Sequence, residues 1–339
     1  MKIDVLIIGG GPAGLKSASL LESLGYKILL IEKESTVGGH IKYWDRLFPD
    51  STQAKEIVGN LIKDVSQSAI LTDTSVESIA KQQDGIYNTK LSSGATVLSS
   101  TILLTTGFSL FPAEKKEEYG YGIYDGVITN ALLESFFKKE GKITIDNPSK
   151  IGFVHCVGSR DEKAGNKQCS KVCCVTAVKQ AIELKEIFPK AEIYCFYMDL
   201  RMFGRGYEDI YLKAQAEYGI RFIRGRVSEV EGSVNGKVIV KAEDTLSSKP
   251  IKITLDLLVL MCGMIANKSN DKLMESLSIK MGDDGFIHLE NPITDIGKTN
   301  IQGIFAAGSI LGPKTLPDVI GESSTVAFAI DKYLKNINN

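Results

Sequence analysis

The chain has 339 residues, of which 43% are hydrophobic, which is enough for two packed domains and gives no sign of a disordered composition. Lys and Arg (40) balance Asp and Glu (41), giving a net charge of −1, so the composition supports no nucleic-acid or membrane-surface partner. The apolar run at residues 5–8 is too short for a signal-peptide core, and no run approaches membrane-spanning length. Six cysteines without a secretory segment predict a cytoplasmic protein whose cysteines serve metal or redox chemistry.

The first 32 residues have the pattern of a β-strand, a glycine-rich turn, a helix and a second strand. The strands are expected at residues 3–8 and 27–31, and the helix at 15–24. Between them, Gly9, Gly11 and Gly14 form G-x-G-x-x-G, the fingerprint of a dinucleotide-binding βαβ unit. Gly9 permits the tight turn, Gly11 lets the backbone approach a pyrophosphate, and Gly14 lets helix and strand pack closely. Glu32, at the end of the second strand, is positioned to accept hydrogen bonds from an adenosine ribose.

A second strand–loop–helix pattern gathers four of the six cysteines. Residues 151–157 read as a buried strand, 158–167 as a polar turn, and the following residues as a helix to about 188. This pattern places Cys156 at the strand end, and Cys169, Cys173 and Cys174 in the first turns of the helix, where negative charge is stabilised. The spacing C-x12-C-x3-C-C matches neither a ferredoxin nor a zinc-finger pattern. From the residues alone, an iron–sulfur cluster, a redox dithiol, a zinc site and inert burial all stay open.

The remaining segments complete two α/β domains. They are expected to form helices at 132–138, 208–218 and 322–334, strands at 191–198, 220–223, 257–261 and 285–289, and a hairpin at 232–253 with Asn235-Gly236 as its turn. The second domain has no glycine fingerprint, because only Gly158 follows its first strand and the cysteines occupy the turn where a pyrophosphate would lie.

Several short motifs resemble the two-dinucleotide-binding flavoprotein superfamily, the thioredoxin- and glutathione-reductase type. They are the glycine fingerprint, Glu32-Lys33, Gly38-Gly39, and the strand ends at 103–107 (LLTTG) and 303–308 (GIFAAG). The resemblance implies two Rossmann-like domains, the second lacking a nucleotide fingerprint, with FAD at the first site. The FAD-binding domain would be discontinuous (1–112 and 256–339), and the second domain would cover 113–255.

Two positions in the last segment bear on the flavin. The superfamily normally has an aspartate that binds the ribityl chain where this sequence has Ser309. Lys314 could supply positive charge near a reduced, anionic flavin ring, or it could be a solvated loop lysine. The residues implied to bind the cofactor are Gly9, Gly11, Pro12, Ala13, Gly14, Glu32, Lys33, Gly38, Gly39, Val76, Thr105, Thr106, Gly107, Gly308, Ser309, Lys314 and Pro317.

A narrower resemblance covers nearly the whole chain and is densest at residues 151–227. The segments 153–162 (FVHCVGSRDE), 169–174 (CSKVCC) and 196–208 (FYMDLRMFGRGYE) resemble the A-type component of heterodisulfide reductase. In that family the four cysteines ligate a [4Fe–4S] cluster beside FAD, which implies Cys156, Cys169, Cys173 and Cys174 as ligands. The sequence has no cysteine before Cys156 or after Cys262, so it resembles the short form found in the heterodisulfide-reductase-like complex of sulfur-oxidising prokaryotes.

This resemblance implies an FAD and iron–sulfur electron-transfer subunit that acts in sulfur-compound oxidation or disulfide redox chemistry. Its implied partners are a second copy of the chain, forming a homodimer, and subunits of the B and C type. Two other functions stay open: a stand-alone flavin-dependent dithiol/disulfide oxidoreductase without a cluster, and a flavin-binding assembly subunit without turnover. No catalytic residue is assigned, because the sequence contains no convincing Ser/His/Asp set.

Overall fold

The computed structural model describes residues 1–338, and the chain divides into two compact units. The first unit comprises Met1–Lys42, Ala54–Ser109 and the segment from Ile265 onward. The second comprises Tyr43–Gln53 and Leu110–Met264. The sequence analysis did not anticipate that Tyr43–Gln53 packs with the second unit.

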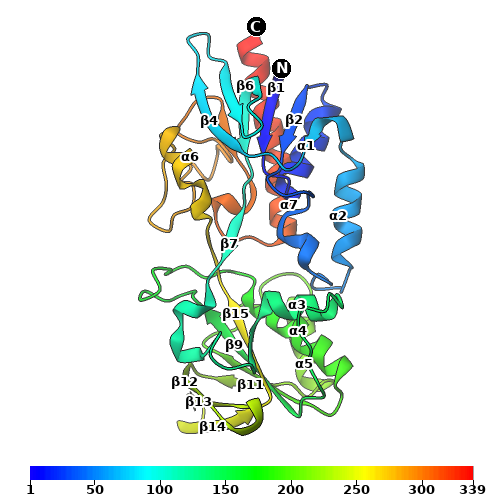
Figure 1. The fold of residues 1–339 in the computed structure, drawn as a ribbon, viewed down its shortest axis with the longest axis vertical. Coiled ribbons are helices and arrows are strands. Elements are labelled where there is room, and N and C mark those ends of the chain that lie inside the picture. Colours follow the sequence, from blue (N-terminus) through cyan, green and yellow to red (C-terminus); the bar gives the residue numbers. More distant parts are fainter. Residues whose placement is uncertain (339) are drawn as a thin grey trace. The chain divides into compact units, whose positions relative to one another are not determined.

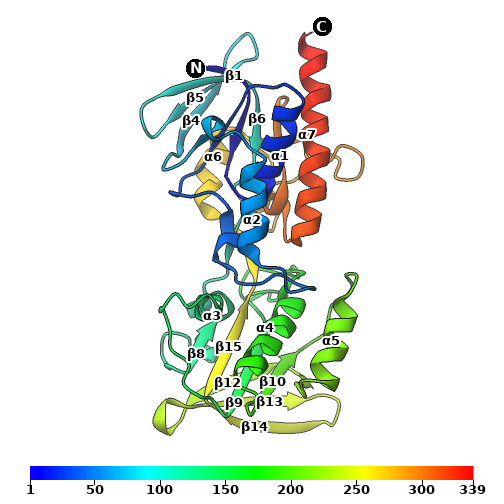
Figure 2. The same cartoon turned by 90° about the vertical axis from the view of Figure 1, so that its right-hand side faces the viewer.

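The first unit is built on a mixed sheet with helices beside it (Figures 1 and 2). The strand order is β3-β2-β1-β6-β5-β4, and β17 also pairs with β6. The strands are β1 (Lys2–Ile8), β2 (Ile28–Ile31), β3 (Ile70–Leu71), β4 (Val76–Lys81), β5 (Tyr87–Leu91), β6 (Thr96–Leu104) and β17 (Ile304–Ala306). The helices are α1 (Pro12–Ser23), α2 (Ala54–Lys63), α6 (Asp271–Ser276) and α7 (Leu316–Asn338).

Strand β1 is apolar on both faces because it lies inside this sheet, parallel to β2 and β6. Val5 and Ile7 pack into a core cluster that also contains residues of α1 and α7. Leu6 and Ile8, which point the other way, pack into a cluster with residues of α6. The position of the glycine turn is therefore fixed by a strand that is buried from both sides.

The second unit is built on a parallel sheet of strand order β11-β10-β9-β15-β8 (Figure 2). Its strands are β8 (Val127–Thr129), β9 (Lys150–Val157), β10 (Glu192–Tyr197), β11 (Arg221–Arg224) and β15 (Leu257–Cys262), and its helices are α3 (Asn130–Phe137), α4 (Cys173–Ile187) and α5 (Tyr207–Ala216). An antiparallel sheet of β12 (Val227–Gly232), β13 (Val238–Asp244) and β14 (Lys249–Leu255) contacts β9 and β11. Strands β7 (Phe108–Leu110) and β16 (Met264–Ala266) pair where the chain passes between the units.

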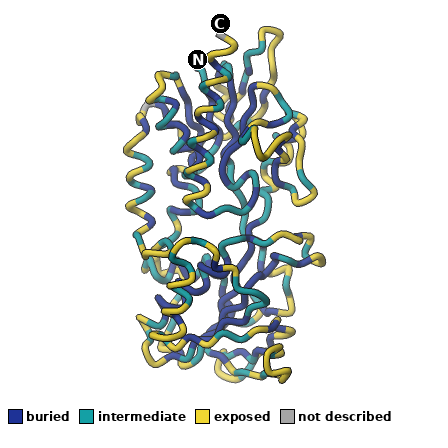
Figure 3. The backbone as a smooth tube through the Cα atoms, turned by 180° about the vertical axis from the view of Figure 1, so that it is seen from behind, coloured by how far each residue is buried: buried dark blue, intermediate teal, exposed yellow. Residues whose placement is uncertain are grey.

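Burial follows this plan within each unit, with the central strands dark blue in Figure 3. The predicted hairpin turn is confirmed, because Asn235 and Gly236 both have positive φ (58° and 71°) between β12 and β13. The predicted strand at 285–289 is wrong. Within the described residues that segment makes only an isolated bridge between Ile287 and Met281, since the Ile287 N–H donates to Ile310 O rather than to a neighbouring strand. The segment has the apolar side chains of a strand, but they serve a different purpose: Ile287 and Leu289 are buried in the core of the first unit.

Candidate functional site

The glycine turn at residues 9–11 is held closely against the end of β6. Thr105 donates its hydroxyl hydrogen toward Ile8 O and Gly9 O, with Oγ1 at 3.0 and 2.8 Å. Gly9 has φ +111°, which only glycine adopts without strain. A Cβ added to Gly14 would collide with the carbonyl oxygen of Gly9. Gly9 and Gly14 are therefore required by the backbone packing itself, whereas a Cβ on Gly11 would make only an ordinary contact at 3.9 Å with the Cα of Gly39.

Glu32 and the Gly38-Gly39 turn join this loop. One carboxylate oxygen of Glu32 accepts the Gly10 N–H at 2.8 Å, and the other accepts the Glu34 N–H at 3.0 Å. The Gly38 N–H donates to Gly10 O at 2.7 Å. A Cβ on Gly39 would lie 3.1 Å from the Cα of Gly11, so the two turns are in contact.

Helix α1 begins at this junction, with Gly11 as its N-cap, Pro12 at its first position and no side-chain cap. The N–H groups of its first turn, which include those of Ala13 and Gly14, are therefore oriented to bind an anionic group such as a pyrophosphate.

The loop after β17 approaches the same helix. Gly308 (φ +82°) is packed so that a Cβ there would lie 2.7 Å from the Cβ of Ala13. The Gly308 N–H donates to one oxygen of Glu322 at 2.7 Å, and Lys314 pairs with the other at 3.2 Å. Lys314 is 19% exposed and is therefore not a fully solvated loop lysine. Glu322 was not predicted as a site residue, because nothing in the local pattern of the sequence indicates that α7 returns a carboxylate to this loop.

The other predicted cofactor residues are less closely tied to the turn. The Thr106 hydroxyl is buried without a hydrogen-bond partner among the described residues, which marks a polar position that a ligand or water would satisfy. Gly107 has φ +69°. Ser309 lies in the 3₁₀ turn Gly308–Leu311, and Pro317 lies in the first turn of α7. Lys33 is exposed, and Val76, the first residue of β4, is partly buried against the core of the first unit.

The second unit places a long loop where the first has its glycine turn. Cys156 lies at the end of β9 with φ +59°, and Cys173 and Cys174 begin α4. The prediction that Cys169 lies in the first turns of that helix is wrong. Lys171 has φ +63°, which interrupts any helix, so Cys169 lies in the loop before α4.

Side-chain hydrogen bonds close this loop. The hydroxyls of Ser159 and Ser170 are 2.5 Å apart and fully buried, and the Met264 N–H donates to Ser170 Oγ at 2.8 Å. The Asn166 side chain donates to Gly158 O at 2.7 Å. These contacts bring the two ends of the loop together. The sequence analysis missed them, since serine and asparagine in a polar loop carry no distinguishing signal.

The four thiols of this loop are close enough to influence one another. Burial raises the pKa of Cys156 to about 12, with Cys174 and Cys169 adding to the rise and the arginines Arg160 and Arg201 opposing it. Burial, followed by the charges of the other three cysteines, raises the pKa of Cys173 well above its usual range. Thiolates at these positions therefore need additional positive charge, which a bound metal supplies.

The surroundings of the sulfurs fit such a group. The Lys171 N–H donates to Cys169 Sγ at 3.3 Å. Burial raises the pKa of Cys174 as well as that of Cys173, and hydrogen bonds from the Arg201 backbone and from Ser170, respectively, oppose these rises. Backbone with positive φ recurs around the loop, at Cys156, Gly158, Arg160 and Lys171; such turns form the concave N–H arrangements that bind anions and iron–sulfur clusters. Across residues 1–338, however, no group of three or more His, Cys, Asp or Glu side chains stands ready-arranged as metal ligands.

The remaining chemistry-bearing residues lie apart from this loop or are inert. Cys195 and Cys262 are buried in β10 and β15. His155, beside Cys156, has both ring nitrogens buried without a partner among the described residues, and burial lowers its pKa to about 4, so the ring is neutral. No described helix has the length and apolar character needed to cross a membrane.

The sequence matches the profile of the pyridine nucleotide-disulphide oxidoreductase family over residues 3–131 and 174–329. The two matched stretches flank β9 and the cysteine loop. An A-type iron–sulfur component of the CoB–CoM heterodisulfide reductase of Methanopyrus kandleri is 32% identical, over 96% of this chain and 63% of that protein. The A-type component of the H2/formate:CoB–CoM heterodisulfide,ferredoxin reductase of Methanococcus maripaludis is 41% identical, over 68% of this chain and 36% of that protein. The chain thus spans less than two thirds of the length of these relatives.

Solved structures agree on the fold. Thioredoxin reductase from Lactococcus lactis, in its FR conformation, superposes with a TM-score of 0.70 and 20% identity, covering 98% of this chain and 99% of that one. Thioredoxin reductase from T. acidophilum gives a TM-score of 0.67 with 16% identity over 99% of both chains. These likenesses confirm the predicted fold of two Rossmann-like domains. The chain therefore belongs to the pyridine nucleotide-disulphide oxidoreductase family and is an FAD-dependent oxidoreductase, similar over most of its length to the A-type components of heterodisulfide reductase.

Proposed function

We propose that this chain is the FAD and iron–sulfur electron-transfer subunit of a heterodisulfide-reductase-like complex. The observation that carries the proposal is the gathering of four cysteines at one strand–loop–helix junction: Cys156 at the end of β9, Cys169 in the loop, and Cys173 and Cys174 at the start of α4. They lie close enough for the charges of the others to raise the pKa of Cys156 and Cys173 beyond the larger effect of burial. Hydrogen-bond donors and two arginines around them favour the thiolate form that metal ligation requires. Cysteines that only fill space in a core would not need hydrogen-bond donors and arginines beside their sulfurs.

Each unit contributes one binding function in this proposal. The first turn of α1 and the Gly38-Gly39 turn would bind the pyrophosphate of FAD, and Glu32 would accept from the adenosine ribose with its remaining lone pairs. The cysteine loop would hold a [4Fe–4S] cluster. When bound, the flavin would supply two-electron chemistry and the cluster one-electron transfer, so that the pair links the two.

The wider assignment rests on the relatives. Their names describe A subunits of CoB–CoM heterodisulfide reductases, which supports a sulfur-containing substrate and other subunits as partners. Partners of the B and C type are part of the same proposal. Sulfur-compound oxidation, a cytoplasmic location and a homodimer belong to the same proposal. The substrate site would lie on a partner, and this chain would exchange electrons with it.

The test is iron and acid-labile sulfide per FAD in protein purified without oxygen. We expect about four irons and four sulfides per flavin, as for one [4Fe–4S] cluster, and their loss in Cys173→Ala. Cys195→Ala is the matched control, because Cys195 is fully buried in β10 of the same unit and lies outside the loop; it should keep its iron. Flavin without iron, both before and after anaerobic reconstitution, would overturn the proposal and favour a dithiol at the same cysteines.

A further inference from the structure

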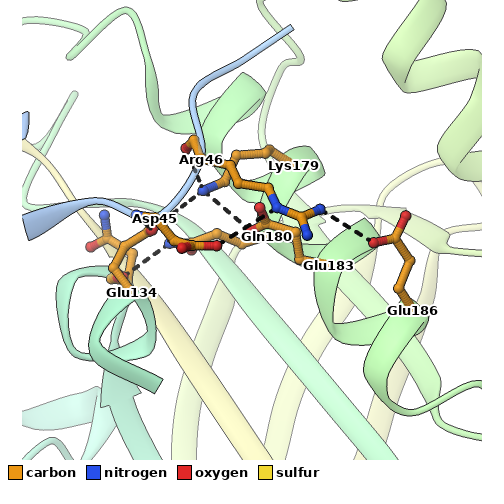
Figure 4. Close-up of polar contacts among 8 residues, drawn as sticks. Asp45, Arg46, Glu134, Lys179, Gln180, Glu183 and Glu186 are labelled. Carbon is orange, nitrogen blue, oxygen red and sulfur yellow. Dashed lines mark hydrogen bonds and ion pairs between the residues drawn. The ribbon is translucent and has the colours of Figure 1, made fainter. Parts of the chain in front are cut away.

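The segment Tyr43–Gln53, which we call the strap, is docked on α3 and α4 of the second unit by buried polar groups (Figure 4). The Asp45 N–H donates to Oε2 of Glu134 at 2.9 Å. Lys179 Nζ donates to Arg46 O at 3.0 Å. In both contacts the partner on the helix is an ionisable side chain, Glu134 or Lys179. The docking of the strap therefore depends on the charges of these two side chains.

Three of these ionisable side chains are almost completely buried. Lys179 on α4, Glu134 on α3 and Glu183 on α4 have exposed side-chain fractions of 4%, 2% and 7%. Lys179 Nζ lies 2.7 Å from Glu134 Oε1 and 3.2 Å from Glu183 Oε2. One buried cation thus faces two buried carboxyl groups. If both were ionised, the cluster would carry an uncompensated negative charge, which is costly in the protein interior.

The hydrogen bonds around Gln180 and Glu183 include fewer donors than these two side chains have acceptor oxygens. The Gln180 amide donates to Glu134 Oε1 at 2.7 Å and to Asn130 O at 3.0 Å. In the described part of the chain, this leaves Gln180 Oε1 without a hydrogen-bond partner, and Lys179, at 3.2 Å, is the one polar partner of Glu183. An ionised Glu183 can only accept hydrogen bonds, whereas a protonated one supplies a hydrogen. The balance of charges and the shortage of hydrogen-bond donors therefore both indicate that the cluster of Lys179, Glu134 and Glu183 binds a proton.

The surrounding charges determine where that proton resides. Burial raises the pKa of Glu183 to about 7, and the Glu134 charge adds to the rise, while Lys179 and Arg46 oppose it. The other charged groups nearby are Asp45 on the strap and Glu186 on α4, which lies 3.6 Å from the Arg46 guanidinium. Because Arg46 also pairs with the half-buried Asp45 and the exposed Glu186, it does not neutralise Glu183 fully.

We propose that Lys179, Glu134 and Glu183 form a proton-binding site, and that loss of its proton loosens the strap from α3 and α4. With the proton on Glu183, the charge of Lys179 is balanced by Glu134, and the ammonium group can still donate to Arg46 O. Without it, a second buried carboxylate competes for Lys179 and draws it from the strap. The proton passes to solvent, and no covalent bond of the chain changes.

The strap continues from the Gly38-Gly39 turn of the first unit, and α4 begins with Cys173 and Cys174. The proton site therefore lies partly on the helix that begins with two of the cysteines, and it contacts the segment that follows the Gly38-Gly39 turn in the chain. The inference does not depend on either cofactor, because its readouts are a backbone exchange rate and a carboxyl vibration.

Hydrogen–deuterium exchange of the strap peptides in the full-length protein tests this inference at about pH 6 and pH 8.5, on either side of the titration. After correction for intrinsic exchange, we expect protection of the wild-type strap to fall about tenfold at the higher pH. Glu183→Gln mimics the protonated side chain and should keep full protection at both pH values. Glu243→Gln is the control for the loss of one carboxylate, since this side chain is exposed on β13 of the same unit; it should behave as the wild type.

Two results would overturn the proposal: wild-type protection that does not change with pH, or an equal fall in Glu183→Gln. Infrared spectroscopy of the wild type gives a second readout that is independent of how well the variant folds. The spectrum should contain a protonated carboxyl band at about pH 6 that disappears by about pH 8.5. A spectrum without such a titrating band would also overturn it.

Discussion

The two units place different structures at the same point of the same motif. In the first, β1 and α1 are joined by residues 9–11, a turn held by backbone groups and by Thr105. In the second, β9 and α4 are joined by residues 158–172, a loop closed by the side chains of Ser159, Ser170 and Asn166. Both loops follow the carboxyl end of a central parallel strand, where α/β sheets bind ligands.

The difference indicates how one architecture supports two kinds of site. The short turn consists of glycines and carries no side chains, so a ligand there meets backbone N–H groups and a helix N-terminus, which suit a phosphate. The long loop removes that close approach, and four thiols from the loop and the two elements it joins lie there instead. Burial raises the pKa of Cys156, Cys173 and Cys174, which makes them poor thiolates unless a metal is bound. The first site thus depends on glycine, and the second on side-chain hydrogen bonds.

The largest expected effect follows from Gly14→Ala in the short turn. The added Cβ would collide with Gly9 O, so we expect a loss of about 3 kcal/mol or more in the free energy of unfolding, together with loss of bound flavin. Gly59→Ala in α2 is the matched control, because its Cβ would meet nothing within 4 Å; it should stabilise by about 0.5–1 kcal/mol. Urea unfolding and the flavin absorbance measure both. A Gly14→Ala protein that keeps its flavin and stability would break the comparison.

The second effect concerns pH and the helix that carries two of the cysteines. Burial raises the pKa of Glu183 from 4.5 to about 7, so between these values the folded chain holds a proton that the unfolded chain has released. Stability should therefore fall as pH rises through this window, by up to about 3 kcal/mol from this group. Glu183→Gln should remove that slope in urea unfolding measured from about pH 4.5 to 8. An unchanged slope in the variant would contradict the assignment.

The smallest effect sharpens the contrast between the loops. Ser170→Ala removes the hydroxyl that contacts Ser159 and accepts the Met264 N–H, and it should cost about 2 kcal/mol because buried groups lose their partner. Under the proposed function it should also lower the iron content. Ser247→Ala, at an exposed serine bound only to Asp244, should change stability by less than about 0.5 kcal/mol. Equal stabilities for the two variants would show that the loop is held by its backbone, like the glycine turn.

The sequence by itself determined the features that depend on short-range pattern. The glycine fingerprint, the acid at Glu32 and the alternation of strands and helices predicted the α/β fold, because turn geometry and strand burial act within a few residues. The intervals between the cysteines likewise located the candidate cluster loop, although the sequence left its occupant open. The prediction that Cys169 lies in the helix was wrong, because the spacing of residues cannot reveal that Lys171 adopts a left-handed conformation.

Only the tertiary structure decided the contacts between distant segments. The Glu322 carboxylate beside Gly308, the hydroxyl pair of Ser159 and Ser170, and the strap on α3 and α4 all depend on where elements pack. The proton site is the clearest case, because Glu134 and Lys179 are 45 residues apart and each alone would read as an exposed helix residue. Their charge balance arises from shared burial, a property of the packed chain that no local sequence pattern encodes.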